Sequence, residues 1–222
     1  MYVVNDLPSQ IAPALIALLA RAEPATIGHV LHAGFMDIGM RGLLADRRIA
    51  GTAITVRAPG PDCTMVHYAL GQARPGDVLV IDRAGDHRHA ATGGAVAYAA
   101  RKAGVAGIVL DGVVSDIGEL RQYGVPVWAR GVSTVTTKHL DFGGEFCTPV
   151  SCGGVAVSPG DAILADENGV LVLRAAQIET AARTAIAMQE AEKELLARLD
   201  AGEKLPDISG ATARVRAALG LA

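Results

Sequence analysis

Apolar residues recur with helical spacing in some segments of this chain and as short continuous runs in others. Residues 51–57 are rich in β-branched side chains and predict a strand, which the proline-rich segment 58–61 ends. A short helix is predicted at 64–72. The same criteria then predict a strand at 78–82, a helix at 92–103, a strand at 106–110, a helix at about 116–123 and a strand at 125–129. This β-α-β-α-β order implies right-handed crossovers and a sheet that is at least partly parallel.

The two ends of the chain have different patterns. Residues 11–22 have helical spacing, and Pro24 is placed to start a second helix that runs toward His32. Short strands separated by glycine turns are expected from 148 to 173, and a long amphipathic helix from 175 to about 201. We therefore predict one α/β domain over 1–222 with layered sheets. The helical extension at about 175–222 could pack on a neighbouring subunit.

Two segments of the chain resemble each other. Residues 74–82 and 158–166 both place a Pro-Gly-Asp turn before an apolar strand that ends at an aspartate. Two turn-and-strand units at similar places in a sheet explain this similarity. The first unit is the more interesting of the two, because its strand leads directly into the polar loop 83–89.

Composition and charge limit the classes of function that this chain can have. The chain has 222 residues, a net charge of -3, 50% hydrophobic residues and 4% aromatic residues, so it can bury one core and has no basic, aromatic surface for nucleic acid. Cys63, Cys147 and Cys152 have no C-x-x-C spacing and are interpreted as reduced thiols. With no basic N-terminal region and no apolar run of about 20 residues, we expect a soluble, cytoplasmic protein without a membrane partner.

The chain lacks the phosphate-loop, G-x-G-x-x-G, G-x-S-x-G and H-E-x-x-H patterns, which argues against common nucleotide-binding and hydrolase classes. A carboxylate-centred site remains. Asp111 and Asp116 flank a strand-to-helix corner, where Asp116 could cap the next helix or bind magnesium. Gly93 and Gly94 could permit a tight turn, or could expose N–H groups that hold a carboxylate.

Several segments resemble the RraA-like family, which includes class II 4-hydroxy-4-methyl-2-oxoglutarate/4-carboxy-4-hydroxy-2-oxoadipate aldolases and protein inhibitors of ribonuclease E. The matching segments are 51–56, 75–80, 104–112, 124–131 and 159–170. The resemblance covers about 50–173. It implies a layered β/β/α fold with a partly parallel central sheet, assembly into trimers or hexamers, and a site at the subunit interface.

The resemblance also implies a motif, which this chain keeps only in part. The aldolases have an acidic residue, twenty intervening residues and then Arg-Asp, in which the aspartate binds a divalent metal and the arginine supports the substrate oxygens. Here Gly94 takes the acidic position and Ser115 the arginine position, while Asp116 matches. Retro-aldol cleavage needs a base for the 4-hydroxyl and a Lewis acid for the enolate, and the loss of one preorganised donor typically costs about 10²–10³ in rate.

Other residues are candidates to compensate. Arg88 could replace the missing guanidinium and His89 could act as acid or base; alternatively, both are solvated loop residues. Arg130 could bind a substrate carboxylate or form a structural ion pair. Gly93, Gly94, Ala95, Val96 and Ser115 are the other predicted substrate-binding residues. Thr136, Thr137 and Lys138 could line the site, although Lys138 is a poor candidate for a Schiff base.

The leading hypothesis is an enzyme, a Mg²⁺- or Mn²⁺-dependent lyase with Asp116 as metal ligand. It would act on a small oxo acid as a 4-hydroxy-4-methyl-2-oxoglutarate-type aldolase, as an oxaloacetate decarboxylase, or as both. Two alternatives stay open. One is a non-enzymatic regulatory protein of the same family, and the other is an enzyme with different chemistry built on the loop 87–89.

Overall fold

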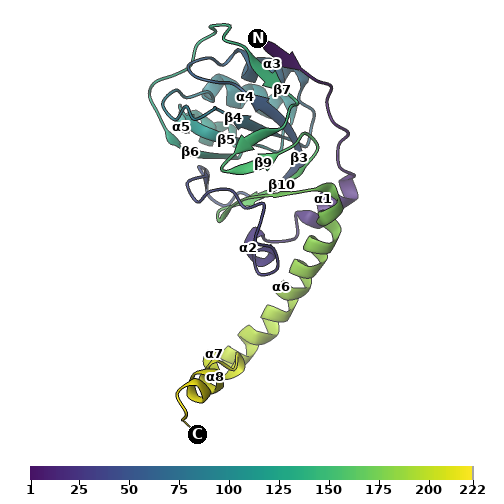
Figure 1. Ribbon diagram of the computed structural model, residues 1–222, viewed down its shortest axis with the longest axis vertical. Helices are drawn as coiled ribbons and strands as arrows, with labels where there is room; N and C mark the ends of the chain where they lie inside the picture. Colours follow the sequence, from purple (N-terminus) through teal and green to yellow (C-terminus); the bar gives the residue numbers. More distant parts are fainter. Residues whose placement is uncertain (222) are drawn as a thin grey trace.

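The centre of the molecule is a mixed β-sheet in which four neighbouring strands run parallel (Figure 1). The protein is described by a computed structural model over residues 1–221. The parallel strands are β3 (Ile49–Arg57), β4 (Asp77–Asp82), β5 (Gly107–Val114) and β6 (Val127–Val132). They are connected through α3 (Thr64–Gln72), α4 (Gly94–Ala103) and α5 (Ile117–Tyr123). The predicted partly parallel α/β sheet is confirmed, and β5 extends beyond its expected end at residue 110.

Short strands widen this sheet, and a hairpin covers part of it. The additional strands of the sheet are β1 (Tyr2–Val4), β2 (Arg41–Gly42), β7 (Gly144–Phe146), β10 (Ala162–Asp166) and β11 (Gly169–Leu173). The hairpin consists of β8 (Val150–Cys152) and β9 (Val155–Val157). Four of these seven strands lie between residues 148 and 173, where the sequence predicted a β-rich layer.

The sheet separates two apolar clusters. Helices α3, α4 and α5 cover one face, where Val66, Ala97 and Leu120 pack on buried strand residues. On the other face, residues of the β8–β9 hairpin pack against Trp128. Because the parallel strands are covered on both faces, their residues are apolar in continuous runs instead of alternating. The result is the layered β/β/α arrangement that was expected.

Helices near the two ends of the chain pack together. They are α1 (Pro13–Leu19), α2 (Pro24–Ile27), the 3₁₀ turn η1 (Ala175–Gln177) and α6 (Ile178–Asp200). The helix predicted from Pro24 toward His32 ends already at Ile27. The reason is tertiary, since Phe35 pairs with Leu171 of β11 and the chain must leave its helical path to reach that strand.

The C-terminal helix α6 leaves the body of the protein after its first turns (Figure 1). Ile178, Ala182 and Ala185 are buried against α1 and the β10–β11 pair, whereas residues 190–194 are exposed. The chain ends in the exposed helices α7 (Leu205–Ile208) and α8 (Ala211–Ala218). Residue 222, the last of the predicted domain 1–222, lies outside the described residues. Among residues 1–221, no helix combines the length and apolar character that crossing a membrane requires.

The two Pro-Gly-Asp units flank the same strand. Unit 74–82 provides β4, parallel to β3, and unit 158–166 provides β10, antiparallel to the opposite edge of β3. In both turns the aspartate accepts the N–H of the residue three positions earlier, at 2.9 Å for Asp77 and 2.7 Å for Asp161. Each aspartate also forms an ion pair with an arginine, Asp77 with Arg74 and Asp161 with Arg174. The similarity of the two segments therefore has a structural origin in the turns.

We expect Asp166→Asn to make the protein more stable near pH 7 than the parent. The Asp166 side chain is fully buried, Oδ2 has no hydrogen-bond partner within the described chain, and the nearest cation is Arg48 at 3.8 Å. Burial raises the pKa of Asp166. A raised folded-state pKa contributes stability below the unfolded pKa, and this contribution is lost as the pH rises through the folded value. Asparagine does not titrate, so its advantage should grow with pH.

The gain near pH 7 should be about 1 kcal/mol. Urea unfolding of both proteins from pH 3.5 to 7 measures it. Asp207→Asn, at an exposed site, is the matched control. A stability difference that is constant across this pH range would contradict the prediction.

Candidate functional site

The end of β5 and the start of α4 border one cavity of about 240 Å³. Its lining residues come from the start of α3, the segment 90–96, the end of β5 and the loop after β6. They are Cys63, His67, Ala90, Ala91, Gly93, Gly94, Ala95, Val96, Ser115, Asp116, Thr136, Thr137, Lys138 and His139. The structure therefore brings together six of the predicted site residues, Gly93 to Val96, Ser115 and Asp116.

Asp116 is held in place by the turn that precedes α4. Its Oδ2 accepts hydrogen bonds from the Gly94 N–H at 2.9 Å and from Ser115 Oγ at 3.1 Å. Asp116 occupies the N-cap position of α5, but its side chain makes no capping bond there, and its φ of 55° is left-handed. Oδ1 accepts no hydrogen bond from the described residues. One carboxylate oxygen thus remains for a ligand in the cavity.

The Gly93-Gly94 pair makes this contact possible. A Cβ atom on Gly93 would collide with Asp116 Oδ2 and lie 2.7 Å from Ser115 Oγ. The Gly94 N–H that binds Asp116 is one of the free donors at the N-terminus of α4, where the helix dipole also favours a carboxylate. The anion that these glycines bind is therefore a side chain of the protein itself.

Glu119 is a site residue that the sequence analysis missed. A Cβ atom on Gly94 would overlap the Glu119 carboxylate, so Glu119 occupies the space in which an acidic side chain at position 94 would begin. Glu119 lies in the first turn of α5, three residues after Asp116. That spacing, which places both side chains on one side of the helix start, was the available signal.

Arg88 and His89, the two residues predicted to compensate for the missing motif, do not line the cavity. His89 Nδ1 lies 2.8 Å from Asp86 Oδ2. Burial alone would raise the pKa of Asp86, but hydrogen bonds from Arg88 N–H and from His89 outweigh it and leave this pKa lowered. Arg88 is exposed, and its carbonyl accepts a hydrogen bond from Ser133 at 2.7 Å. Their catalytic role stays a prediction.

Arg130 lies outside the cavity as well. Its guanidinium donates to Asp111 and, at 2.9 Å, to Asp37. The hydrogen bond to Asp111 is the main cause of the raised pKa of Arg130. Asp111 also accepts the Gly153 N–H at 2.8 Å, and His87 Nε2 lies 3.6 Å from it. Of the two possibilities for Arg130, the structure shows an ion pair that ties β5 and β6 to neighbouring loops.

The loop after β6, residues 136–139, forms one wall of the cavity, and backbone contacts hold it in place. Thr136 pairs with Ala90, and Lys138 pairs with Asp62. The Lys138 N–H donates to Pro61 O at 2.8 Å. Lys138 is the lysine among the lining residues, and it borders the same cavity as Asp116. The expectation that residues 136–138 line the site agrees with this geometry.

The oxygen atoms at Asp116 fit a hard divalent cation. Magnesium binds proteins through one or two carboxylates and keeps several waters. Asp116 Oδ1 provides a ligand of that kind in the cavity, and the Glu119 carboxylate lies close by, against Gly94. Asp116 is therefore the residue that would hold such a cation.

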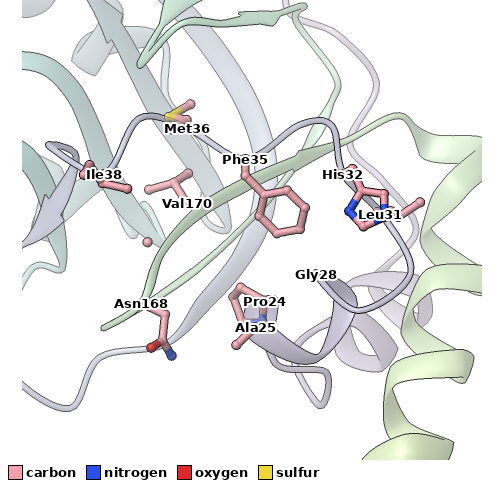
Figure 2. A pocket seen from close by; sticks show the side chains of 11 residues that line it. Pro24, Ala25, Gly28, Leu31, His32, Phe35, Met36, Ile38, Asn168 and Val170 are labelled. Carbon is pink, nitrogen blue, oxygen red and sulfur yellow. The ribbon is translucent and has the colours of Figure 1, made fainter. Parts of the chain in front are cut away.

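A larger depression of about 430 Å³ lies between α2 and the β10–β11 turn. Figure 2 shows its mostly apolar lining, with the Phe35 ring among residues that include Pro24, Met36, Ile38 and Val170. His32 is the ionisable side chain in this lining. Acid-base and metal chemistry therefore favour the smaller cavity at Asp116.

Solved structures with this arrangement of layers define the fold. A Streptomyces coelicolor protein, described as an unusual member of the RraA family of RNase ES inhibitors, has a TM-score of 0.75 and 26% identity. The similarity covers 84% of this chain and 98% of that one. A Pseudomonas syringae protein of 22% identity shares the fold with a TM-score of 0.77 over 90% of this chain and 98% of that one.

Residues 26–172 match the RraA-like family, Aldolase/RraA, and the chain belongs to this family. A Thermus thermophilus protein named 4-hydroxy-4-methyl-2-oxoglutarate aldolase is 36% identical over 147 residues, which cover 66% of this chain and 85% of that protein. A Halalkalibacterium halodurans protein that carries the same name provisionally is 38% identical over 132 residues, or 60% of this chain. The chain spans only 62% of the length of that relative.

Proposed function

We propose that this protein is a divalent-metal-dependent carbon-carbon lyase that acts on a small oxo acid at the Asp116 cavity. The observation that carries the proposal is the Asp116 carboxylate, which accepts the Gly94 N–H through Oδ2 and whose Oδ1 has no hydrogen-bond donor among residues 1–221, at a cavity that Lys138 and Ser115 also line. Relatives named as aldolases support the reaction class. The substrate proposed first is 4-hydroxy-4-methyl-2-oxoglutarate, and oxaloacetate is the second.

Each residue at the cavity has a separate role in the proposed reaction. Bound Mg²⁺ or Mn²⁺ would supply Lewis-acid stabilisation of the negative charge that develops on the 2-oxo oxygen. Asp116 holds the cation, Ser115 and Gly94 orient Asp116, and Glu119 provides the second acidic group that the motif otherwise has at position 94. Lys138 supplies the positive charge for a substrate carboxylate in place of the arginine that Ser115 replaces.

The direct test measures pyruvate release from 4-hydroxy-4-methyl-2-oxoglutarate and from oxaloacetate. The protein is first freed of metal by chelation, and Mg²⁺ or Mn²⁺ is then added back. We expect release to depend on the added cation with at least one of the two substrates. Absence of cation-dependent release from both substrates would refute the proposal.

Lys138→Met should lower kcat/KM by about 10- to 100-fold, mainly through KM. A charge-assisted hydrogen bond contributes about 1.5–3 kcal/mol, and methionine keeps most of the side-chain volume while it removes the charge. Steady-state kinetics of Lys138→Met, Arg88→Met and His89→Ala in parallel measure this effect. A larger loss in Arg88→Met than in Lys138→Met would favour the assignment made from the sequence.

We further propose that the protein is a homo-oligomer in which the C-terminal arm, residues 186–221, contacts a neighbouring subunit. Leu196, Leu205, Val215 and Leu219 on this arm are between 51% and 66% exposed, which leaves apolar surface uncovered in a single chain. The double variant Leu196→Glu/Leu205→Glu should shift the mass measured by light scattering toward the monomer. The double variant Glu192→Gln/Lys204→Gln on the same arm is the control, and equal masses for both variants would contradict the proposal.

A regulatory function is the second candidate, because two similar structures are described as inhibitors in RNA processing. A pull-down with the scaffold region of ribonuclease E tests it. Retention of this protein on the scaffold, together with no cation-dependent pyruvate release, would favour the regulatory function over the lyase.

A further inference from the structure

One thiol and two imidazoles meet at the wall of the cavity formed by α3 and the loop after β6. Cys63, His67 and His139 each offer one ligand atom, and these atoms all lie within 4.8 Å of one another. We propose that Cys63, His67 and His139 form a binding site for Zn²⁺ that is separate from the Asp116 carboxylate.

The spacing of Cys63 and His67 follows from helix α3. Cys63 is the N-cap residue of this helix and His67 lies four positions later, so the two side chains share one face, one turn apart. Cys63 is buried at 5% exposure, whereas His67 is exposed toward the cavity opening. A buried thiol and an accessible imidazole on one helical face make half of a metal site.

His139 is brought to this face by contacts of the backbone. The Cys63 N–H donates to Lys138 O at 3.0 Å, and the buried Asp62 carboxylate accepts the N–H groups of Leu140 at 3.2 Å and Phe142 at 2.8 Å. The positions on both sides of His139 are therefore anchored to the start of α3. Because the loop is already held in place, it would lose little conformational entropy when a cation binds.

The ligand atoms lie only slightly farther apart than in a tetrahedral zinc site. Cys63 Sγ lies 4.0 Å from His139 Nδ1, and the two imidazole rings meet edge to face with centroids 4.6 Å apart. Tetrahedral zinc with Zn–S of about 2.3 Å and Zn–N of about 2.0 Å places its ligand atoms roughly 3.5 Å apart. His67 and His139 are exposed, so rotation of their side chains is the movement that would bring the ligand atoms to that spacing.

The chemistry of the three groups selects the cation. Thiolate with two imidazoles suits zinc, whereas the carboxylate at Asp116 suits magnesium. Three protein ligands leave the fourth position open toward the cavity, as in catalytic zinc sites.

Zinc binding to the metal-free full-length protein tests the proposal independently of any lyase activity. Equilibrium dialysis should show one Zn²⁺ per chain, and Cys63→Ser and His139→Ala should each raise the dissociation constant by more than about 100-fold. Loss of a ligand should exceed the 10- to 100-fold cost of losing a group that only orients one. Cys147→Ser and His32→Ala, outside the cluster, are the matched controls and should bind as the parent does.

A spectroscopic readout keeps the test decisive if a variant folds poorly. Co²⁺ added to the parent should produce a thiolate-to-cobalt charge-transfer band, and Zn²⁺ should displace it. No such band, or zinc affinity unchanged in both Cys63→Ser and His139→Ala, would overturn the proposal. Zinc binding without Mg²⁺- or Mn²⁺-dependent pyruvate release from either substrate would support this site while refuting the lyase.

Discussion

Asp116→Asn is expected to reduce cation-dependent pyruvate release by about 10²–10³-fold. Asparagine keeps the shape of the side chain and an oxygen that can accept the Gly94 N–H, and it tolerates the left-handed backbone at this position. What it removes is the negative charge for a hard cation. The loss should therefore come with weaker Mg²⁺ binding and an intact fold.

Asp46→Asn provides a matched control for this experiment. Asp46 is also left-handed, with a φ of 54°, but it is exposed and does not line the cavity. Rates of both variants are measured over a range of Mg²⁺ concentrations, and circular dichroism reports the fold. If Asp116→Asn retained the parent rate at low Mg²⁺, Asp116 would not be the residue that holds the cation.

Arg83→Met is expected to lower the free energy of unfolding by about 3–5 kcal/mol, because it removes a buried cation and leaves its ion-pair partner Asp86, at 3.5 Å, and several carbonyls without it. The Arg83 side chain is fully buried beneath the loop 58–62. Its guanidinium donates to the carbonyls of Ala58 and Gly60, and to that of Asp62 at 3.1 Å. Methionine fills a similar volume but leaves these carbonyls without their donor.

Urea unfolding monitored by circular dichroism measures this loss. Arg57→Met is the control, since that arginine is exposed and its ion pairs, at 3.8 Å and 3.6 Å, should contribute little. Because the loop 58–62 leads directly to Cys63, Arg83→Met should also weaken zinc binding. A change below about 1 kcal/mol would mean that water replaces the guanidinium, which the burial of Arg83 argues against.

Local patterns in the sequence predicted the elements around the site well. The helix predicted at 64–72 coincides with α3, because its apolar spacing and the turn before it are both local signals. The strand that follows Pro75-Gly76 coincides with β4 for the same reason. Gly93, Gly94 and Asp116 were recognised together, since parallel strands end at one edge of a sheet and place their following loops side by side.

Side-chain partners were harder to predict. Arg130 and His89 were assigned from residue type and position along the chain, but their nearest carboxylates, Asp111 and Asp86, are their partners in the folded protein. Arg83 was treated as part of a polar loop and is fully buried. Which carboxylate or carbonyl a cation meets depends on the direction of each side chain, and sequence patterns do not report that direction.

Periodicity, turn chemistry and short motifs in the sequence were enough to predict an at least partly parallel sheet, the family, and the glycine turn that shares a site with Asp116. The position of Glu119 beside Gly94, and that of His139 next to Cys63 and His67, became apparent only in the folded protein. Cys63 and His139 are 76 positions apart. Their approach depends on the buried Asp62 carboxylate, whose hydrogen bonds to Leu140 and Phe142 close a long loop that no local pattern describes.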